Sequence, residues 1–375
     1  MRKLTYLDYN ATAPVRPVVI EAMREVLERT GNPSSVHRFG REARRALERA
    51  RAAVAALVGA APAQVVFTSG GTEANNQALR SARGPVVVSA IEHDSVLAAV
   101  PDAQRIPVDG DGNIDLGRLE RMRAALAPDL VSVMLANNET GVIQPVREVV
   151  ELARGHGARV HCDAVQGGGK LAIDMAALGV DLLTLSAHKF GGPQGVGALV
   201  VGEGVEPDAL LHGGGQERRW RPGTENLPGI VGFGRACELA MGDNDWWERT
   251  GALRDRLETR IAALAPAARV FGRSATRLPN TSCLTMPGVG NQTQLIEFDL
   301  AGIAVSTGSA CSSGKVGPSH VLAAMGIEPA EAASAIRVSL GWASTAEEVE
   351  RFVDAWSRLY VRTRRAAADA IARPA

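Results

Sequence analysis

The stretch DLLTLSAHK, residues 181–189, decides the fold. It begins as an apolar run of strand length and ends on a histidine and a lysine, before the glycine-rich FGGPQGVG. Five more runs resemble it: QVVFTS, PVVVSA, LVSVMLA, ARVHCDA and VGALVVG. Helix-like or loop segments separate most of them. This pattern predicts an α/β domain with a mainly parallel sheet that is buried on both faces.

The chain has 375 residues, which is more than one hydrophobic core usually holds. Its character changes near residue 245, where helices and short strands follow the α/β pattern. We expect a large domain at 14–245 and a smaller α+β domain made of 1–13 and 246–375. Apolar periodicity predicts helices over 16–31 and 41–59, each ending at a glycine, Gly31 and Gly59.

The composition of the chain argues against several classes of protein, including nucleic-acid-binding, membrane and disulfide-rich proteins. The 41 basic and 41 acidic residues balance, which gives no support for binding to nucleic acid or a membrane surface. The N-terminus has no apolar signal region and no apolar run is long enough to span a membrane, so we expect a cytoplasmic protein. Cys162, Cys237 and Cys283 read as core residues, and the absence of any CxxC argues against a disulfide framework or a cysteine-rich zinc site. His161, Cys162 and Asp163 match no metal-site spacing, so no metal is expected.

Polar side chains follow nearly every predicted strand, and ligands of parallel sheets bind beyond the carboxyl ends of the strands. Within this edge the sequence places SGGTE at 69–73, EH at 92–93, NNE at 137–139, DAVQ at 163–166 and SAHK at 186–189. We therefore expect the active site here.

Three of these groups together suit pyridoxal phosphate. Gly71 and Thr72 would open a helix and offer an anion site, although a plain tight turn would look the same. Lys189 could form a Schiff base with an aldehyde. The alternative is an ordinary solvated surface group, as most lysines are. Asp163 could keep a pyridine nitrogen protonated or simply form a turn. His93 could stack on the ring and move protons, or only make a local hydrogen bond at a helix start.

The fourth cysteine differs from the others. Cys311 lies in STGSACSSGK, 306–315, where nearly all neighbours are small, so nothing bulky packs against the thiol. A thiol in such surroundings is suited to act as a nucleophile at a surface.

Many ordered motifs resemble one family. They include YLDYNATAPV, GNPSSVHRFG, VFTSGGTEANN, ANNETGVIQP, HCDAVQGGGK, SAHKFGGPQGVGAL, RPGTEN, STGSACSSG and IRVSLG, which together cover almost the whole chain. The sequence is similar to the NifS/IscS cysteine desulfurases, pyridoxal-phosphate enzymes of the class V aminotransferase group. The resemblance implies a fold of type I pyridoxal-phosphate transferases, with a seven-stranded-type sheet.

The resemblance also implies roles for single residues. Lys189 would hold the cofactor covalently, Asp163 would pair with the pyridine nitrogen, and Gln166 would bond the phenolic oxygen beside His93. The phosphate would be bound by Gly71, Thr72, Ser186 and His188, and by Thr224 reaching across a homodimer interface. Asn138, which would also border the cofactor, and Arg337 would bind the substrate carboxylate.

By the same resemblance, Cys311 would take sulfur from L-cysteine as a persulfide and leave L-alanine. The sulfur would pass to an acceptor protein, an iron–sulfur scaffold being one candidate, for cluster or thio-cofactor synthesis. A selenocysteine lyase or another class V aminotransferase on the same fold remains the alternative. A sulfur carrier without cofactor chemistry is a third reading, which the set Lys189, Asp163, Gln166 and His93 opposes.

Overall fold

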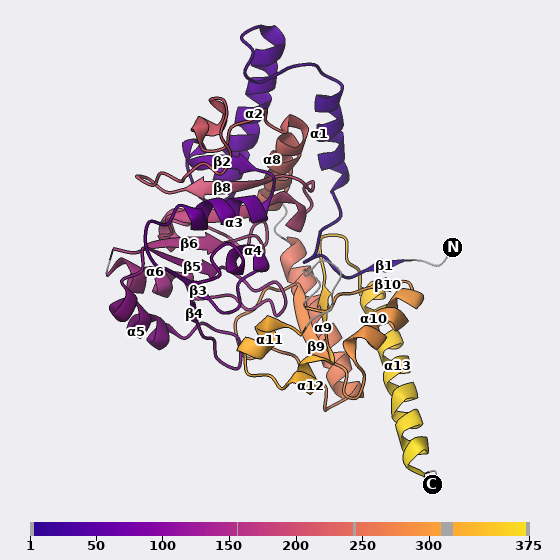
Figure 1. The fold of residues 1–375 in the computed structure, drawn as a ribbon. Helices are drawn as coiled ribbons and strands as arrows, with labels where there is room; N and C mark the ends of the chain where they lie inside the picture. Colours follow the sequence, from indigo (N-terminus) through magenta and orange to yellow (C-terminus); the bar gives the residue numbers. More distant parts are fainter. Residues whose placement is uncertain (1–3, 156, 243–244, 309–317, 373–375) are drawn as a thin grey trace.

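The large part of the molecule is built on one seven-stranded sheet with helices on both faces (Figure 1). The computed structural model describes residues 4–155, 157–242, 245–308 and 318–372. Across the sheet the strands run in the order β2 (Val65–Thr68), β8 (Gly197–Val201), β7 (Leu182–Ser186), β6 (Arg159–Asp163), β5 (Leu130–Met134), β3 (Val86–Ser89) and β4 (Gln104–Ile106).

All six apolar runs form strands of this sheet, and only β8 runs against the others. The prediction of a mainly parallel sheet is therefore confirmed. The carboxyl ends of the six strands with a common direction meet at one edge. The sequence analysis missed β4, a three-residue edge strand whose Gln104 and Arg105 are exposed.

Alternate residues of the strands enter different cores, as the two-residue period of a strand requires. On one face Val66, Leu182 and Leu199 pack with Ala74 and Ala78 of the helix after β2. On the other face the strands pack against the long helices that begin and end this part of the chain. The helices of the large part are α1 (Pro17–Leu27), α2 (Arg38–Leu57), α3 (Gly71–Arg80), α4 (Asp94–Leu97), α5 (Leu116–Leu126), α6 (Val146–Arg154), α7 (Met175–Leu178) and α8 (Leu227–Gly242), with the 3-10 turns η1 (Pro62–Gln64), η2 (Ala187–Lys189) and η3 (Gln216–Arg219).

One of the two predicted helix ends is wrong. Gly59 follows α2 with a φ of 63°, the left-handed conformation that glycine adopts at low cost, as expected. The first helix instead stops at Leu27 and Glu28 caps it, so Gly31 lies beyond the helix end. A Cβ on Gly31 would lie 2.6 Å from the carbonyl oxygen of Phe39, so the glycine permits a close approach to α2.

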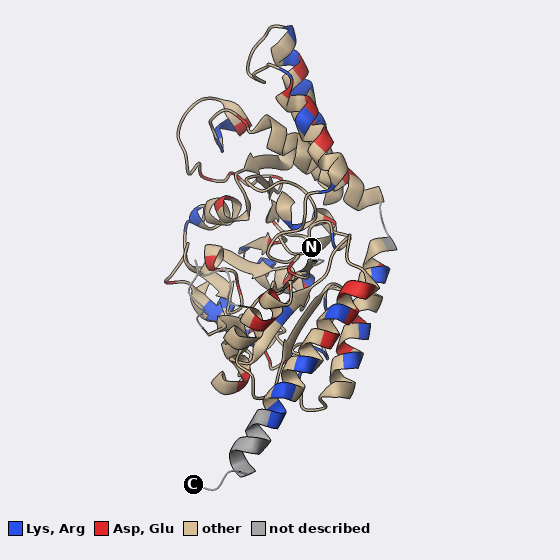
Figure 2. Ribbon diagram, turned by 90° about the vertical axis from the view of Figure 1, so that its right-hand side faces the viewer, with Lys and Arg blue, Asp and Glu red and all other residues tan. Residues whose placement is uncertain are grey.

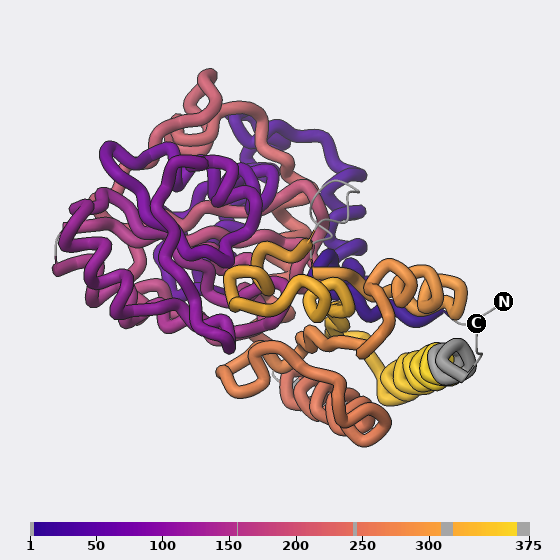
Figure 3. Tube along the Cα trace, turned by 60° about the horizontal axis from the view of Figure 1, so that its bottom comes forward, coloured from indigo at the N-terminus to yellow at the C-terminus, as the bar shows by residue number. Residues whose placement is uncertain are grey.

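The C-terminal part lies beside the large part (Figure 3). It has its own core and two small sheets. The other buried members of this core lie between Leu253 and Leu359, and they include Phe352 and Trp356. Leu7 from the N-terminal segment is buried among them. Its elements are α9 (Asp245–Leu264), β9 (Thr281–Thr285), α10 (Asn291–Leu300), β10 (Ile303–Ala304), α11 (His320–Ala324), α12 (Pro329–Ala332), β11 (Ala335–Ser339) and α13 (Ala346–Ala372). We propose that the separate cores mark the two domains expected at 14–245 and at 1–13 with 246–375.

The N-terminal segment joins the two parts. Strand β1 (Thr5–Tyr6) pairs in parallel with β10, and β9 pairs with β11 in antiparallel register. A third cluster, containing Ile91 and Met134 of the large part and Phe271 and Cys283 of the small part, fills the junction. The carboxyl edge of the large sheet therefore faces the small sheets.

Basic and acidic residues are interspersed along the outer helices (Figure 2). Arg38 pairs with Glu42 on α2, while Arg256 and Arg260 of α9 both reach Glu350 of α13. Such exposed pairs contribute little to stability. Within the residues that the structure describes, no helix is long and apolar enough to cross a membrane.

Candidate active site

A cavity of about 300 Å³ opens at the carboxyl edge of the large sheet. The structure brings ten of the predicted site residues together in its lining: Gly71, Thr72, His93, Asn138, Asp163, Gln166, Ser186, His188, Lys189 and Arg337. They come from five different strand ends and from β11 of the small part, so the site forms only when both parts of the chain pack together.

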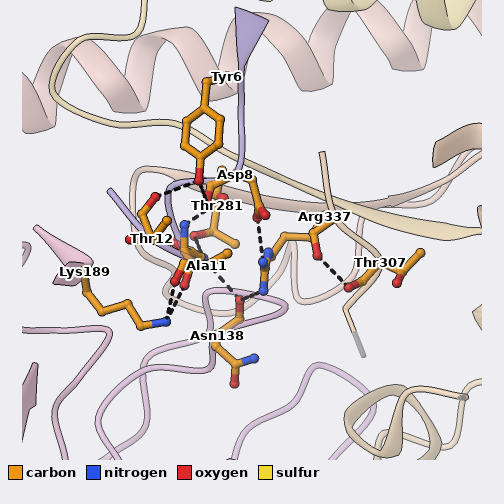
Figure 4. A network of polar contacts seen from close by, with 12 residues as sticks. Tyr6, Asp8, Ala11, Thr12, Asn138, Lys189, Thr281, Thr307 and Arg337 are labelled. Carbon is orange, nitrogen blue, oxygen red and sulfur yellow. Dashed lines mark hydrogen bonds and ion pairs between the residues drawn. The ribbon is translucent and has the colours of Figure 1, made fainter. Parts of the chain in front are cut away.

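Lys189 lies at the end of η2, directly after β7. Its amine donates to the main-chain carbonyls of Asn10, at 2.8 Å, and Ala11, at 3.1 Å (Figure 4). The side chain is half-buried, and the two carbonyls fix its amine at the cavity wall. The N-terminal segment therefore positions the candidate Schiff-base lysine.

Asp163 ends β6 and is almost fully buried. Its carboxylate accepts from the Asn75 side-chain amide at 2.7 Å and from the Val165 main-chain N–H at 2.9 Å. The two donors hold both oxygens in place. Asn75, which lies on α3 one turn after Gly71, is a site residue that the sequence analysis missed.

The start of α3 forms a tight cradle. A Cβ at Gly71 would lie 2.8 Å from Cγ2 of Val165, so only glycine fits without movement. The positive end of this ten-residue helix and the Thr72 hydroxyl suit an anion. Ser186 and His188 border the same cavity from the end of β7.

His188 is a neutral member of the site. Burial, with the charges of Lys189 and Lys170 adding to it, lowers the pKa of His188 to about 4. One ring nitrogen, Nδ1, lies 3.2 Å from the Thr12 hydroxyl. The histidine therefore offers hydrogen bonds and no net charge near pH 7.

His93 makes the expected local hydrogen bond and also lines the cavity. It caps α4, and its Nδ1 accepts from the Ser95 N–H at 3.0 Å, which is the expected local bond. Because Nδ1 accepts, the proton of the neutral ring lies on Nε2. The ring also lines the cavity, so a local hydrogen bond orients a side chain that faces the site.

Arg337 closes the cavity from β11 and is 2% exposed. Its Nη2 donates to Asp8 at 2.7 Å, and its Nη1 donates to the main-chain carbonyl of Asn138 at 3.0 Å (Figure 4). Among the residues that the structure describes, its Nε has no hydrogen-bond partner. Arg337 therefore has one donor without a partner among the described residues, and its side chain lines the cavity.

Three polar residues expected at the strand ends lie beneath the site rather than in it. Glu92, Asn137 and Glu139 are buried and do not line the cavity. Burial raises the pKa of Glu92 well above its usual range, and one of its oxygens accepts from the Met134 N–H at 2.7 Å. Asn137 accepts from the N–H of Glu139 at 2.9 Å. These side chains support the backbone, and the sequence pattern alone could not separate them from their neighbours in the cavity.

The structure also locates the other residues considered from the sequence. His161 is buried, with Nδ1 2.8 Å from the Ser132 hydroxyl and Nε2 3.0 Å from that of Thr184. Cys162, Cys237 and Cys283 are buried, as expected. Over the described ranges, no cluster of His, Cys, Asp and Glu could hold a metal ion.

Among the described residues, one predicted site residue does not line the cavity. Thr224 borders a separate cavity of about 230 Å³ with Thr68, Arg221 and Glu225. Cys311 lies in 309–317, outside the described residues.

Asn10 is the central residue that the sequence analysis did not single out. It is 1% exposed, and its carbonyl accepts from both Lys189 and the Gln166 amide. Its own side-chain amide donates to Thr281 at 2.8 Å. The motif YLDYNATAPV contains it, but nothing in the local sequence shows that this segment enters the site.

The comparisons agree with this architecture. The model of the family "Aminotransferase class-V" matches residues 5–352. A cysteine desulfurase of Cereibacter sphaeroides is 48% identical over 93% of this chain and 94% of its own, and a cysteine desulfurase IscS of Dictyoglomus turgidum is 41% identical over 97% and 96%. The solved structure of a NifS-like protein from Rickettsia africae has a TM-score of 0.90 and 36% identity, covering 96% of this chain and 99% of its own. The chain therefore belongs to the class V aminotransferase family, in its cysteine desulfurase branch.

Proposed function

We propose that this protein is a pyridoxal-phosphate-dependent cysteine desulfurase that passes sulfur to Cys311. The observation that carries the proposal is the meeting of the Lys189 amine, the Asp163 carboxylate and the Gly71–Thr72 cradle in one cavity of about 300 Å³. A lysine, an acid and a phosphate cradle are the three groups that this cofactor needs from a protein.

The residues present fit the cofactor. The α3 cradle accepts no side chain at Gly71, which leaves room for a phosphate against the helix start, where Thr72, Ser186 and His188 would bind it. Asp163, held by Asn75 and Val165, would face the pyridine nitrogen. Gln166 and His93 would contact the ring. When bound, the cofactor would act as an electron sink for the carbon atoms of the substrate.

The chain supplies the remaining chemistry. Arg337 and Asn138 would bind the α-carboxylate of L-cysteine, since both line the cavity and a guanidinium suits a carboxylate. His93, with its proton on Nε2, and the Lys189 amine are placed to move protons.

The Cys311 thiolate would be the nucleophile of the sulfur transfer. The thiolate attacks the sulfur of the substrate, an S–S bond forms, and the C–S bond breaks with its electron pair moving to carbon. A proton at that carbon completes L-alanine, and Cys311 keeps the sulfur as a persulfide. Attack requires the thiolate, so a group at the site must accept the proton of the thiol.

The partner proposals rest on the family. Thr224 borders a cavity of its own within the single chain, and we propose that it completes the phosphate site of a second subunit in a homodimer. The sulfur acceptor would be another protein, an iron–sulfur scaffold being the first candidate because one relative is named IscS. The cytoplasmic location stays a prediction.

The decisive experiment measures L-alanine and sulfide from L-cysteine with a reductant present. Wild type should form both, and Lys189→Ala and Cys311→Ala should form neither. The yellow colour of the bound cofactor should disappear only from Lys189→Ala. Full activity of Cys311→Ala would contradict the persulfide step and favour a lyase, and a requirement for a keto acid would favour an aminotransferase.

A further inference from the structure

A second lysine, Lys170, is buried beside the site and has no part in the proposed reaction. It is 3% exposed, in the segment GGGK that follows β6, whereas lysine side chains almost always reach solvent. Burial, with the charges of Lys189 and Arg337 adding to it, lowers the pKa of Lys170 well below its usual range. Burying a lysine amine is unfavourable in free energy, so we expect this side chain to have a specific role.

The contacts of Lys170 are specific. Its amine donates to the side-chain oxygen of Asn10 at 2.9 Å and to that of Gln166 at 2.9 Å. Over the described residues these are its two recorded acceptors. Both acceptors are side-chain amide oxygens, so the two bonds fix the amine and the two amides relative to one another.

These bonds decide how Gln166 is turned. Because the amide oxygen of Gln166 faces Lys170, its NH₂ group points the other way and donates to the main-chain carbonyl of Asn10 at 3.0 Å. Gln166 also lines the cavity, so its N–H donors are directed at the wall on which Lys189 lies. Without Lys170 the amide oxygen of Gln166 would lose this bond, and the bond of its NH₂ group to the Asn10 carbonyl would remain.

The same bonds reach Lys189. The carbonyl oxygen of Asn10 accepts from Gln166 and, at 2.8 Å, from the amine of Lys189. Asn10 is held on its other side by Lys170 and by the Asn280 amide at 3.1 Å. Two lysine amines are thus joined through one asparagine.

We propose that Lys170 is a positioning residue: it locks the amides of Asn10 and Gln166, and these fix the carbonyl that holds Lys189 and the N–H that Gln166 presents to the cofactor. The proposal rests on the proposed function only in that Lys189 carries the cofactor. It assigns Lys170 no contact with substrate.

The test is a pH titration of the visible band of the holoprotein without substrate, for wild type, Lys170→Met and Lys170→Gln. Methionine keeps the length of the side chain and removes both donors. Loss of the polar amine, and of a fixed Gln166 donor, leaves less positive potential near Lys189, so the pH midpoint should rise by about one unit, a tenfold change in proton binding. Glutamine has two N–H donors, so the midpoint of Lys170→Gln should lie between those of wild type and Lys170→Met.

A matched control separates this effect from a general loss of packing. Arg277 is also buried, bonds both oxygens of Glu258 at 2.9 and 3.0 Å, and does not line the cavity. Arg277→Met should lower the unfolding temperature and leave the midpoint unchanged. Equal midpoints in Lys170→Met and wild type, or equal shifts in Lys170→Met and Arg277→Met, would overturn the proposal.

Two further results keep the outcome clear. If Lys170→Met does not fold, Lys170→Leu, which also lacks the donors, takes its place, and a wild-type midpoint in Lys170→Leu then contradicts a role through Asn10 and Gln166. A wild-type protein without any visible band would contradict the proposed function instead, so the two failures are distinguishable.

Discussion

Replacing Arg337 by lysine would test the substrate-binding end of the site. The guanidinium is 2% exposed, and two of its nitrogens are engaged by Asp8 and Asn138. Lysine keeps the charge but loses the planar fork, so it cannot bond Asp8 and Asn138 and also a carboxylate in the cavity.

The expected magnitude follows from one charged hydrogen bond. Such a bond contributes about 1.5–3 kcal/mol, which is a factor of about 10 to 150 in kcat/KM. The carboxylate is present before and during the reaction, so the loss should appear mainly as a higher KM.

The assay is the rate of sulfide release as a function of concentration, with L-cysteine and with cysteamine, which has no carboxylate. Wild type should prefer L-cysteine strongly, and Arg337→Lys should lose most of this preference. Arg277→Lys is the matched control, because Arg277 is buried against Glu258 outside the cavity. If Arg337→Lys slows both compounds equally, Arg337 only holds Asp8 and the reasoning is refuted.

Three other perturbations test the structure around the site. Gly308→Ala would place a Cβ 2.0 Å from the Glu139 carboxylate that Ser319 holds, so urea unfolding should show a loss of about 1–3 kcal/mol, and an unchanged stability would contradict this packing. Glu217→Gln should cost about 3–5 kcal/mol in the same assay because Arg51 would lose its buried partner and keep only the exposed Glu48, and a loss below about 1 kcal/mol would be inconsistent with a closed ion pair. Burial lowers the pKa of His161 to about 4, so as the pH falls below 6.5 the unfolded chain binds a proton at this residue before the folded chain does. The free energy of unfolding of wild type should therefore fall by up to about 3 kcal/mol between pH 6.5 and 4, and that of His161→Gln should fall less. Parallel stability profiles of the two proteins would rule this out.

The sequence predicts the large sheet and most of its site because both follow from local patterns. Apolar runs of strand length are visible without any contact information, and parallel strands place their carboxyl ends together. Lys189 and Asp163 therefore needed no tertiary knowledge to be grouped. The short strand β4 was missed because its exposed Gln104 and Arg105 interrupt the apolar pattern.

The supporting residues could not be predicted in the same way. Lys170 follows three glycines, and nothing in this local pattern predicts that it is buried and bonded to Asn10, 160 positions away. Glu92 precedes His93 in the sequence, yet one lies under the backbone and the other in the cavity. Such differences depend on how distant segments meet, which a local pattern does not record.

The contact between Asp8 and Arg337 joins residues 329 positions apart, and it has a consequence for how the protein is made. A ribosome delivers the first strand at the beginning of translation and β11 near its end. Each nascent chain therefore carries Lys189, Asp163 and the α3 cradle for some time before Arg337 exists. A chain that a nonsense codon ends between Lys189 and Arg337 would contain the groups that hold a cofactor. It would lack the guanidinium that we propose binds the amino acid.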